Sequence, residues 1–243
     1  MSTSYFQFKQ FTIHQDRCAM KVTTDACLFG AWAAGIVWSQ GLGVKNILDI
    51  GTGTGLLSLM LAQQCNASID TIEVDKDTFE QAGENIAASL WADRIKVFQG
   101  DARAFRFPVQ YDIIISNPPF YEKDLMSDNT KKNLAHHNEG LFLSELLVII
   151  KKNLQPDGSF YLLMPYKRKE EIRKLFIETD LSIQQLTFLR QSADHNYFRI
   201  MLAGKLKTKK QAETMIDEIS IKDKEGQYTP FFVKLLKDYY LYL

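Results

Sequence analysis

Apolar and polar positions along the chain alternate between two periods. Short apolar runs typical of buried strands are separated by segments in which apolar residues recur at helical spacing. The strands predicted by this pattern cover residues 46–50, 68–74, 95–98, 111–116, 159–164, 181–189 and 196–203, after a weak strand-like lead-in at 6–13. The predicted helices cover residues 24–38, 56–64, 76–91, 141–154 and 167–177.

This alternation of strands and helices predicts an α/β fold with a doubly wound, mostly parallel sheet. Helices then cover both faces, and a ligand is expected at the carboxyl edge of the strands. The last two predicted strands have no helix between them, which indicates an antiparallel hairpin at one edge of the sheet. We expect a single domain, with an entry segment and helix at 1–40, a core at 41–204 and a C-terminal extension at 205–243.

Composition indicates the class of protein and its cellular compartment. Of 243 residues, 46% are hydrophobic and 24% charged, as in ordinary soluble globular proteins. No apolar run is long enough to span a bilayer, and the N-terminus lacks a secretion signal. The three cysteines show no paired spacing, so we expect neither a disulfide framework nor a zinc site, and we predict a cytoplasmic location.

A glycine-rich turn joins the first predicted core strand to its helix. It reads Asp49-Ile-Gly51-Thr-Gly53-Thr-Gly55. A dinucleotide-binding fingerprint would place another glycine at position 56, where this chain has leucine. S-adenosylmethionine has no pyrophosphate, so a turn that passes beneath its amino-acid tail and ribose fits this spacing. Alone the signal is weak, because many purely structural turns look alike.

Acidic residues at the ends of the next two strands strengthen the cofactor hypothesis. Glu73 ends the second strand and is expected to accept the ribose hydroxyls, while Asp75 is interpreted as the N-cap of the next helix. Asp101, followed by Ala102, ends the third strand and is placed to accept the adenine amino group. Together with Asp49, these acids predict an S-adenosylmethionine site.

The tetrad Asn117-Pro118-Pro119-Phe120 follows the strand at 111–116. Each proline fixes its own φ and restricts the residue before it, so the strand ends in a defined turn. The Asn117 side-chain oxygen and the Pro118 carbonyl can accept the two N–H groups of a planar amine and stabilise the positive charge that develops on nitrogen. Phe120 can stack on the base. We therefore predict methylation of an exocyclic amino nitrogen, with all four residues in the catalytic site.

Taken together, the glycine turn, Glu73, Asp101 and the tetrad resemble the ordered motifs of class I Rossmann-like methyltransferases. The resemblance implies a seven-stranded sheet, mostly parallel with one antiparallel edge strand, and S-adenosylmethionine bound over its carboxyl edge. The implied cofactor contacts also include Asn117.

The two ends of the chain are similar to a narrower family, the bacterial tRNA1(Val) adenine-37 N6-methyltransferases. The likeness lies in residues 8–25, in Leu28-Phe-Gly-Ala-Trp32, and in Tyr228-Thr-Pro leading to Asp238-Tyr-Tyr-Leu-Tyr242. It implies that Lys21, Thr24 and Asp25 cover the cofactor pocket and that the substrate is an adenine in a tRNA anticodon loop. The polar loop at 121–139 departs from the family pattern, since it carries His136-His137 where the family has Arg before His or Tyr.

Other functions fit less well. A release-factor-type glutamine N5-methyltransferase or an rRNA adenine methyltransferase would use the same tetrad, but the former usually has tyrosine at its fourth position and a helical N-terminal domain. A non-catalytic RNA-binding module would not need the methyl-transfer motifs. Cytosine C5 methylation needs a cysteine near a strand end, and His136-His137 lack a third metal ligand. We expect no metal, no membrane and no obligate protein partner.

RNA binding needs a basic face and not a basic total, so a formal net charge of zero permits it. Four local clusters of basic residues lie in the second half of the chain: Lys131-Lys132, Lys151-Lys152, Lys167-Arg168-Lys169 and Lys205 to Lys210.

Overall fold

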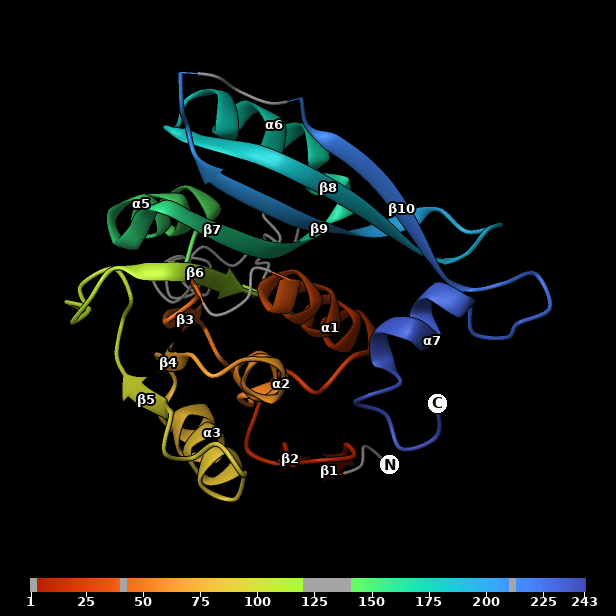
Figure 1. The fold of residues 1–243 in the computed structure, drawn as a ribbon, viewed down its shortest axis with the longest axis horizontal. Helices are drawn as coiled ribbons and strands as arrows, with labels where there is room; N and C mark the ends of the chain where they lie inside the picture. Colours follow the sequence, from red (N-terminus) through yellow and green to blue (C-terminus); the bar gives the residue numbers. More distant parts are fainter. Residues whose placement is uncertain (1–3, 40–42, 120–140, 210–212) are drawn as a thin grey trace, which may run out of the picture.

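An eight-stranded sheet forms the centre of the computed structural model, which describes residues 4–39, 43–119, 141–209 and 213–243 (Figure 1). Its strand order is β10-β8-β9-β7-β6-β3-β4-β5. The strands are β3 (Asn46–Ile50), β4 (Ser68–Glu73), β5 (Ile95–Gln99), β6 (Tyr111–Ser116), β7 (Leu154–Pro165), β8 (Leu181–Ser192), β9 (Tyr197–Leu206) and β10 (Met215–Lys222).

The strand directions confirm the class I α/β fold and correct two details of the prediction. β9 runs antiparallel to both β7 and β8, so the antiparallel strand lies inside the sheet and not at its edge. The edge is β10, an eighth strand that pairs in parallel with β8. The sequence pattern did not reveal β10 because its first four residues, two apolar and then two acidic, do not alternate, so only its second half has the period of a half-buried strand.

Helices cover both faces of the sheet (Figure 1). The first apolar cluster packs α1 (Thr24–Ser39), α2 (Leu56–Gln64), α3 (Lys76–Ala87) and α7 (Pro230–Leu236) against one face. The second cluster packs α5 (Leu143–Asn153) and α6 (Lys169–Ile177) against the other, with the short 3₁₀ helix η3 (Tyr166–Arg168) before α6. The bounds predicted for β3, α2 and β6 agree with the structure, whereas β7 is longer than predicted and α3 shorter.

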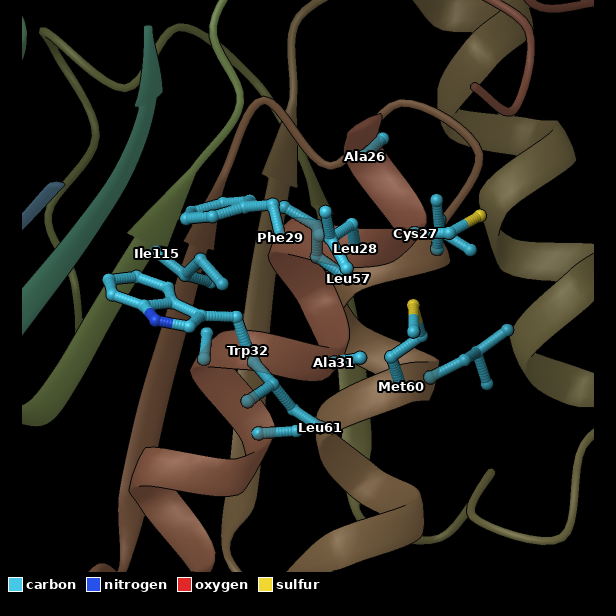
Figure 2. Packing of buried hydrophobic residues seen from close by; sticks show 14 of the residues in the cluster. Ala26, Cys27, Leu28, Phe29, Ala31, Trp32, Leu57, Met60, Leu61 and Ile115 are labelled. Atoms are coloured by element: carbon cyan, nitrogen blue, oxygen red, sulfur yellow. The ribbon is translucent and has the colours of Figure 1, made fainter. Parts of the chain in front are cut away.

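α1 and α2 approach each other closely (Figure 2). A Cβ atom on Gly30 of α1 would lie only 2.6 Å from the Met60 sulfur of α2, so glycine permits this contact. Figure 2 shows Phe29 and Trp32 of α1 in the same apolar cluster as Leu57 of α2. This packing fixes the start of α1 beside the glycine turn that precedes α2.

The two ends of the chain meet on the same side of the molecule (Figure 1). The N-terminal hairpin consists of β1 (Tyr5–Gln7) and β2 (Thr12–His14), and Phe8 in the connection between them bridges to Tyr240. α7 was not predicted, although Thr229 caps it by accepting a hydrogen bond from the Phe232 N–H and proline follows at its first position. Within the described residues, no helix combines the length and apolar character needed to cross a membrane.

Candidate active site

A cavity of about 830 Å³ opens at the carboxyl ends of β3, β4, β5 and β6. It lies where a doubly wound sheet is expected to bind its ligand, and its volume is typical of small-molecule sites. The lining residues predicted from the sequence are Lys21, Gly51, Gly53, Glu73, Asp101, Ala102, Asn117, Pro118 and Pro119. Phe120 and His136-His137 lie outside the described residues.

The glycine turn forms the floor of this cavity. Gly51, Gly53 and Gly55 have φ angles of 72°, 57° and 83°, in the left-handed region that other residues rarely adopt. A Cβ atom on Gly51 or Gly53 would meet no other atom within 4 Å, because the backbone there faces open space. Gly55 does not line the cavity but precedes the first residue of α2. The turn therefore presents bare backbone to a ligand.

Asp49 lies beneath the turn and does not line the cavity. Its side chain is completely buried, and Oδ2 accepts hydrogen bonds from the hydroxyls of Thr52 (2.7 Å) and Ser58 (2.8 Å). Oδ1 has no hydrogen-bond partner among the described residues. Burial raises the pKa of Asp49 to about 6, although the two hydroxyls oppose the shift. Asp49 therefore stabilises the glycine turn from its buried side.

Glu73 lines the cavity and connects β4 to the glycine turn. One carboxylate oxygen accepts the backbone N–H of Gly53 at 3.0 Å. The other accepts the N–H groups of Val74 (2.9 Å) and Asp75 (3.1 Å). These contacts fix the carboxylate at the cavity wall. As predicted, Asp75 caps α3 by accepting the Thr78 N–H at 2.9 Å, and hydrogen bonds from the Thr78 side chain and then from its backbone lower the pKa of Asp75.

Asp101 is held by a residue that sequence reasoning missed. The Arg103 guanidinium donates to both Asp101 oxygens at 2.6–2.9 Å and also lies 3.5 Å from Glu145 at the start of α5. The hydrogen bond from Arg103 holds the pKa of Asp101 below its usual value. Asp101 remains partly exposed on the cavity wall, so the pair leaves it accessible to a ligand.

Asn117, Pro118 and Pro119 form the wall on the side of β6. The Ser116 hydroxyl donates to the Ile50 carbonyl at 2.7 Å, which fastens the end of β6 to the end of β3. Because β3 and β6 are neighbouring parallel strands, the tetrad begins beside the glycine turn. The structure thus brings part of the predicted cofactor motif and the first three tetrad residues together in one cavity.

The entry segment before α1 forms another wall. Lys21 lines the cavity and donates to the Gln15 carbonyl, but Thr24 and Asp25 do not line it. Asp25 instead forms an ion pair of 2.7 Å with Arg199 of β9. Asp25 therefore ties the start of α1 to the sheet, behind the residues that line the cavity.

Several lining residues were not predicted. They include Cys18, Ala19, Met20 and Val22 of the entry segment, Thr52 and Thr54 between the glycines, Thr78 of α3, Arg103, and Leu141 before α5. Thr52 and Thr54 could have been predicted, because they lie within the glycine-rich motif. The entry segment has no periodicity that marks it as a cavity wall. No group of three potential metal ligands occurs in the described part of the chain.

The comparisons with known proteins all match methyltransferases. The family described as methyltransferase small domain matches residues 40–169. The tRNA1(Val) (adenine(37)-N6)-methyltransferase of Phocaeicola vulgatus is 39% identical over 99% of both chains. The protein of the same name from Dyadobacter fermentans is 40% identical over 98% of both.

Solved structures share the fold at low sequence identity. A predicted O-methyltransferase from Agrobacterium tumefaciens superposes with a TM-score of 0.63 at 15% identity, over 88% of this chain and 96% of the other. A putative class I S-adenosylmethionine-dependent methyltransferase from Listeria monocytogenes gives a TM-score of 0.62 at 18% identity, over 85% and 67%.

Proposed function

The chain belongs to the family of tRNA1(Val) (adenine(37)-N6)-methyltransferases, and we propose that it methylates N6 of adenine-37 in the anticodon loop of tRNA1(Val). It is an S-adenosylmethionine-dependent methyltransferase. The observation that carries the proposal is the presence of the glycine turn and Asn117-Pro118-Pro119 in the wall of one cavity. A methyl donor and an amine can meet there.

The cavity suits S-adenosylmethionine. Gly51 and Gly53 leave space that a Cβ atom would fill, so a ligand can lie directly on the backbone of the turn. We assign Glu73 to a hydroxyl of the ribose. Its three backbone N–H contacts use three of about four acceptor positions of a carboxylate and leave one for a ligand. When bound, S-adenosylmethionine supplies a methyl group activated by a positively charged sulfur.

We assign the part of the cavity at the end of β5, next to Glu73 of β4, to the adenine of the cofactor. Asp101 and Ala102 line it, and the Asp101 carboxylate can accept the amino group while Arg103 keeps the carboxylate charged. Lys21 closes the cavity from the entry segment, which Asp25 fastens through Arg199. The other predicted cofactor residues do not line the cavity, and we assign them an indirect role in which they position the segments that do: Thr24, Asp25, Asp49 and Gly55.

Asn117 and Pro118 orient the substrate amine. Their two carbonyl oxygens accept its N–H groups, which directs the nitrogen lone pair at the methyl group. The same oxygens stabilise the positive charge that develops as the N–C bond forms. No general base is needed, since the alkylated nitrogen readily releases its proton to water. Phe120 is proposed to stack on the target base.

An unpaired loop base fits such a site, because extruding it costs less than extruding a base from a duplex. We propose tRNA as the partner and the cytoplasm as the location, where the free thiols of Cys18, Cys27 and Cys65 are stable.

The test is methyl transfer from labelled S-adenosylmethionine to bulk tRNA, total rRNA and release factors, followed by nucleoside analysis, with Asn117→Ala as the inactive control. We expect label in N6-methyladenosine from tRNA alone. Label found only in protein would assign the tetrad to glutamine N5 methylation, and label only in rRNA would move the substrate to the ribosome.

A further inference from the structure

The strands on the far side of the tetrad carry a group of aromatic and cationic side chains at the same sheet edge as the cavity. Tyr166 follows β7, Tyr197 begins β9, and Phe188 and Arg190 lie near the end of β8. Lys169 begins α6. We define Tyr166, Lys169, Arg190 and Tyr197, packed on the buried Phe188, as the cationic–aromatic surface.

The rings of this surface form a closed triangle. Ring centroids are 5.3 Å apart for Tyr166 and Phe188, 5.2 Å for Tyr166 and Tyr197, and 5.4 Å for Phe188 and Tyr197. Phe188 is buried, whereas both tyrosines are partly exposed. The two tyrosines therefore have a rigid base, and part of each remains available to a flat, unpaired nucleobase.

Cations lie over these rings. The Lys169 ammonium is 5.3 Å from the centroid of Phe188 and 5.8 Å from that of Tyr166, and the Arg190 guanidinium is 5.4 Å from that of Tyr197. Arg190 shares its charge with Glu218 in an ion pair of 2.8 Å. Among the described residues, Lys169 has no carboxylate within 4 Å, so its charge is available to a phosphate.

Strand register places the surface next to the tetrad. Ser116, the last residue of β6, pairs with Leu162 of β7. β7 continues for three residues to Pro165, which extends about 10 Å past the end of β6 before Tyr166 begins η3. A nucleic-acid strand with one base in the cavity would therefore cross this surface with its neighbouring nucleotides.

Two other basic clusters lie at the opposite edge and are engaged in structural contacts. Lys151, at the end of α5, pairs with Asp180. Lys207, just after β9, donates to the carbonyls of Phe176 and Ile177, the last residues of α6. Lys131-Lys132 lies outside the described residues. Of the three described clusters, only the one at 167–169 is on the cavity edge.

From this arrangement we propose that the cationic–aromatic surface binds the anticodon loop beside the target adenine. Lys169 contacts a phosphate, and Tyr166 and Tyr197 stack on an unpaired base next to the target. The proposal rests on the proposed function, because it requires an RNA substrate. Two features favour RNA over a protein partner, namely available positive charge and two partly exposed tyrosine rings, since any base can stack on an aromatic ring.

The first test compares Lys169→Ala with Lys152→Ala, an exposed lysine at the end of α5 on the opposite edge. The affinity of full-length enzyme for tRNA1(Val) transcript is measured from 0.05 to 0.3 M salt, together with the dissociation constant for S-adenosylmethionine. Loss of one single-strand phosphate contact lowers the slope of log affinity against log salt by about 0.7 and weakens binding about fivefold at 0.1 M salt. We expect this for Lys169→Ala only, with cofactor binding unchanged in both variants.

The second test uses Tyr166. Tyr166→Ala is expected to raise the KM for tRNA about tenfold through lost stacking, and Tyr166→Phe to restore it. A readout that needs no variant is lysine acetylation of wild-type enzyme, in which tRNA1(Val) should protect Lys169 and leave Lys152 reactive. Equal slopes for the two lysine variants, or equal labelling of both lysines, would overturn the proposal.

Failure of this proposal differs from failure of the proposed function. Wild-type enzyme that forms N6-methyladenosine in tRNA, with variants that match the Lys152→Ala control, overturns the surface alone. Wild-type enzyme that places no label in tRNA overturns both. Loss of methylation of a protein substrate by Tyr166→Ala, with tRNA affinity intact, would show that the surface binds protein.

Discussion

The two halves of the carboxyl edge are built differently. Over β3, β4 and β5, carboxylates are held by backbone N–H groups, hydroxyls and one arginine, as the contacts of Glu73, Asp49 and Asp101 show. Over β7, β9 and β8, aromatic rings and cations take their place. The first arrangement suits a small cofactor of fixed shape, whereas the second suits a flexible polyanion. Asn117 lies where the two halves meet.

The largest effect is expected at this meeting point. Asn117→Ala removes one of the two oxygens that orient the amine, so kcat should fall about 10²- to 10³-fold. The dissociation constant for S-adenosylmethionine should stay within about twofold of wild type, since the cofactor half retains its carboxylates. Isothermal titration and single-turnover kinetics measure the two quantities. Undiminished turnover would show that the tetrad is not the methyl-acceptor site.

The buried acid of the cofactor half should make stability depend on pH. The pKa of Asp49 is about 6 in the folded protein and near 3.8 ordinarily, so the folded state keeps a proton that the unfolded state releases between these values. This contribution is fully present below pH 4 and is lost as the pH rises through 6, by at most about 3 kcal/mol. The nearby charge of Glu73 adds to the shift.

Denaturant unfolding of wild type and Asp49→Asn between pH 4 and 7 measures this contribution. The variant serves as the reference, because other titrating groups largely cancel in the difference. We expect the wild-type free energy of unfolding to decrease relative to the variant as the pH rises. A difference in the free energy of unfolding that is constant with pH would mean that burial does not raise the pKa of Asp49.

Glu73 should control cofactor affinity without affecting the substrate half. Glu73→Ala removes an acceptor for a ribose hydroxyl and three backbone contacts, so the dissociation constant for S-adenosylmethionine should rise about 10- to 100-fold. The control is Asp75→Ala, which removes a helix cap and costs about 1 kcal/mol of stability but should leave affinity nearly unchanged. The reverse pattern would transfer the ribose role to Asp75.

The smallest effect is expected for Arg103→Ala. The pair with Asp101 is more than one-third exposed on both sides, so water screens it and its loss should cost less than about 1 kcal/mol of stability. Cofactor affinity should weaken less than about fivefold, because Asp101 remains in the cavity wall. Titration beside Lys151→Ala, a surface variant at the opposite edge, measures this change. A loss as large as that of Glu73→Ala would make Arg103 itself a cofactor ligand.

The cofactor half was largely predictable from sequence because its signals are local. The glycine turn, the acids at strand ends and the Asp75 cap each depend on residues close together in the chain, and the structure brings Gly51, Gly53, Glu73 and Asp101 to one cavity. The sequence did not predict which acidic side chains line the cavity and which are buried beneath it. Asp49 lies below the turn because its partners are the Thr52 and Ser58 hydroxyls.

The substrate half was not predictable because its residues meet only through strand register. Tyr166, Phe188 and Tyr197 lie on three different strand ends, and nothing local links them. The antiparallel insertion of β9 brings Tyr197 to the same edge as Tyr166. β10 was not predicted because its apolar alternation is weak, and it forms a strand through its pairing with β8, which is distant in the sequence.

Methyl transfer to two tRNA1(Val) transcripts, one with adenine at position 37 and one with guanine there, tests the proposed function most directly. We expect N6-methyladenosine in the first transcript and no label in the second, with both transcripts bound equally by the cationic–aromatic surface. Label of equal extent in both transcripts would rule out adenine-37 as the target, because the cavity beside Asn117 would then accept a different nucleotide.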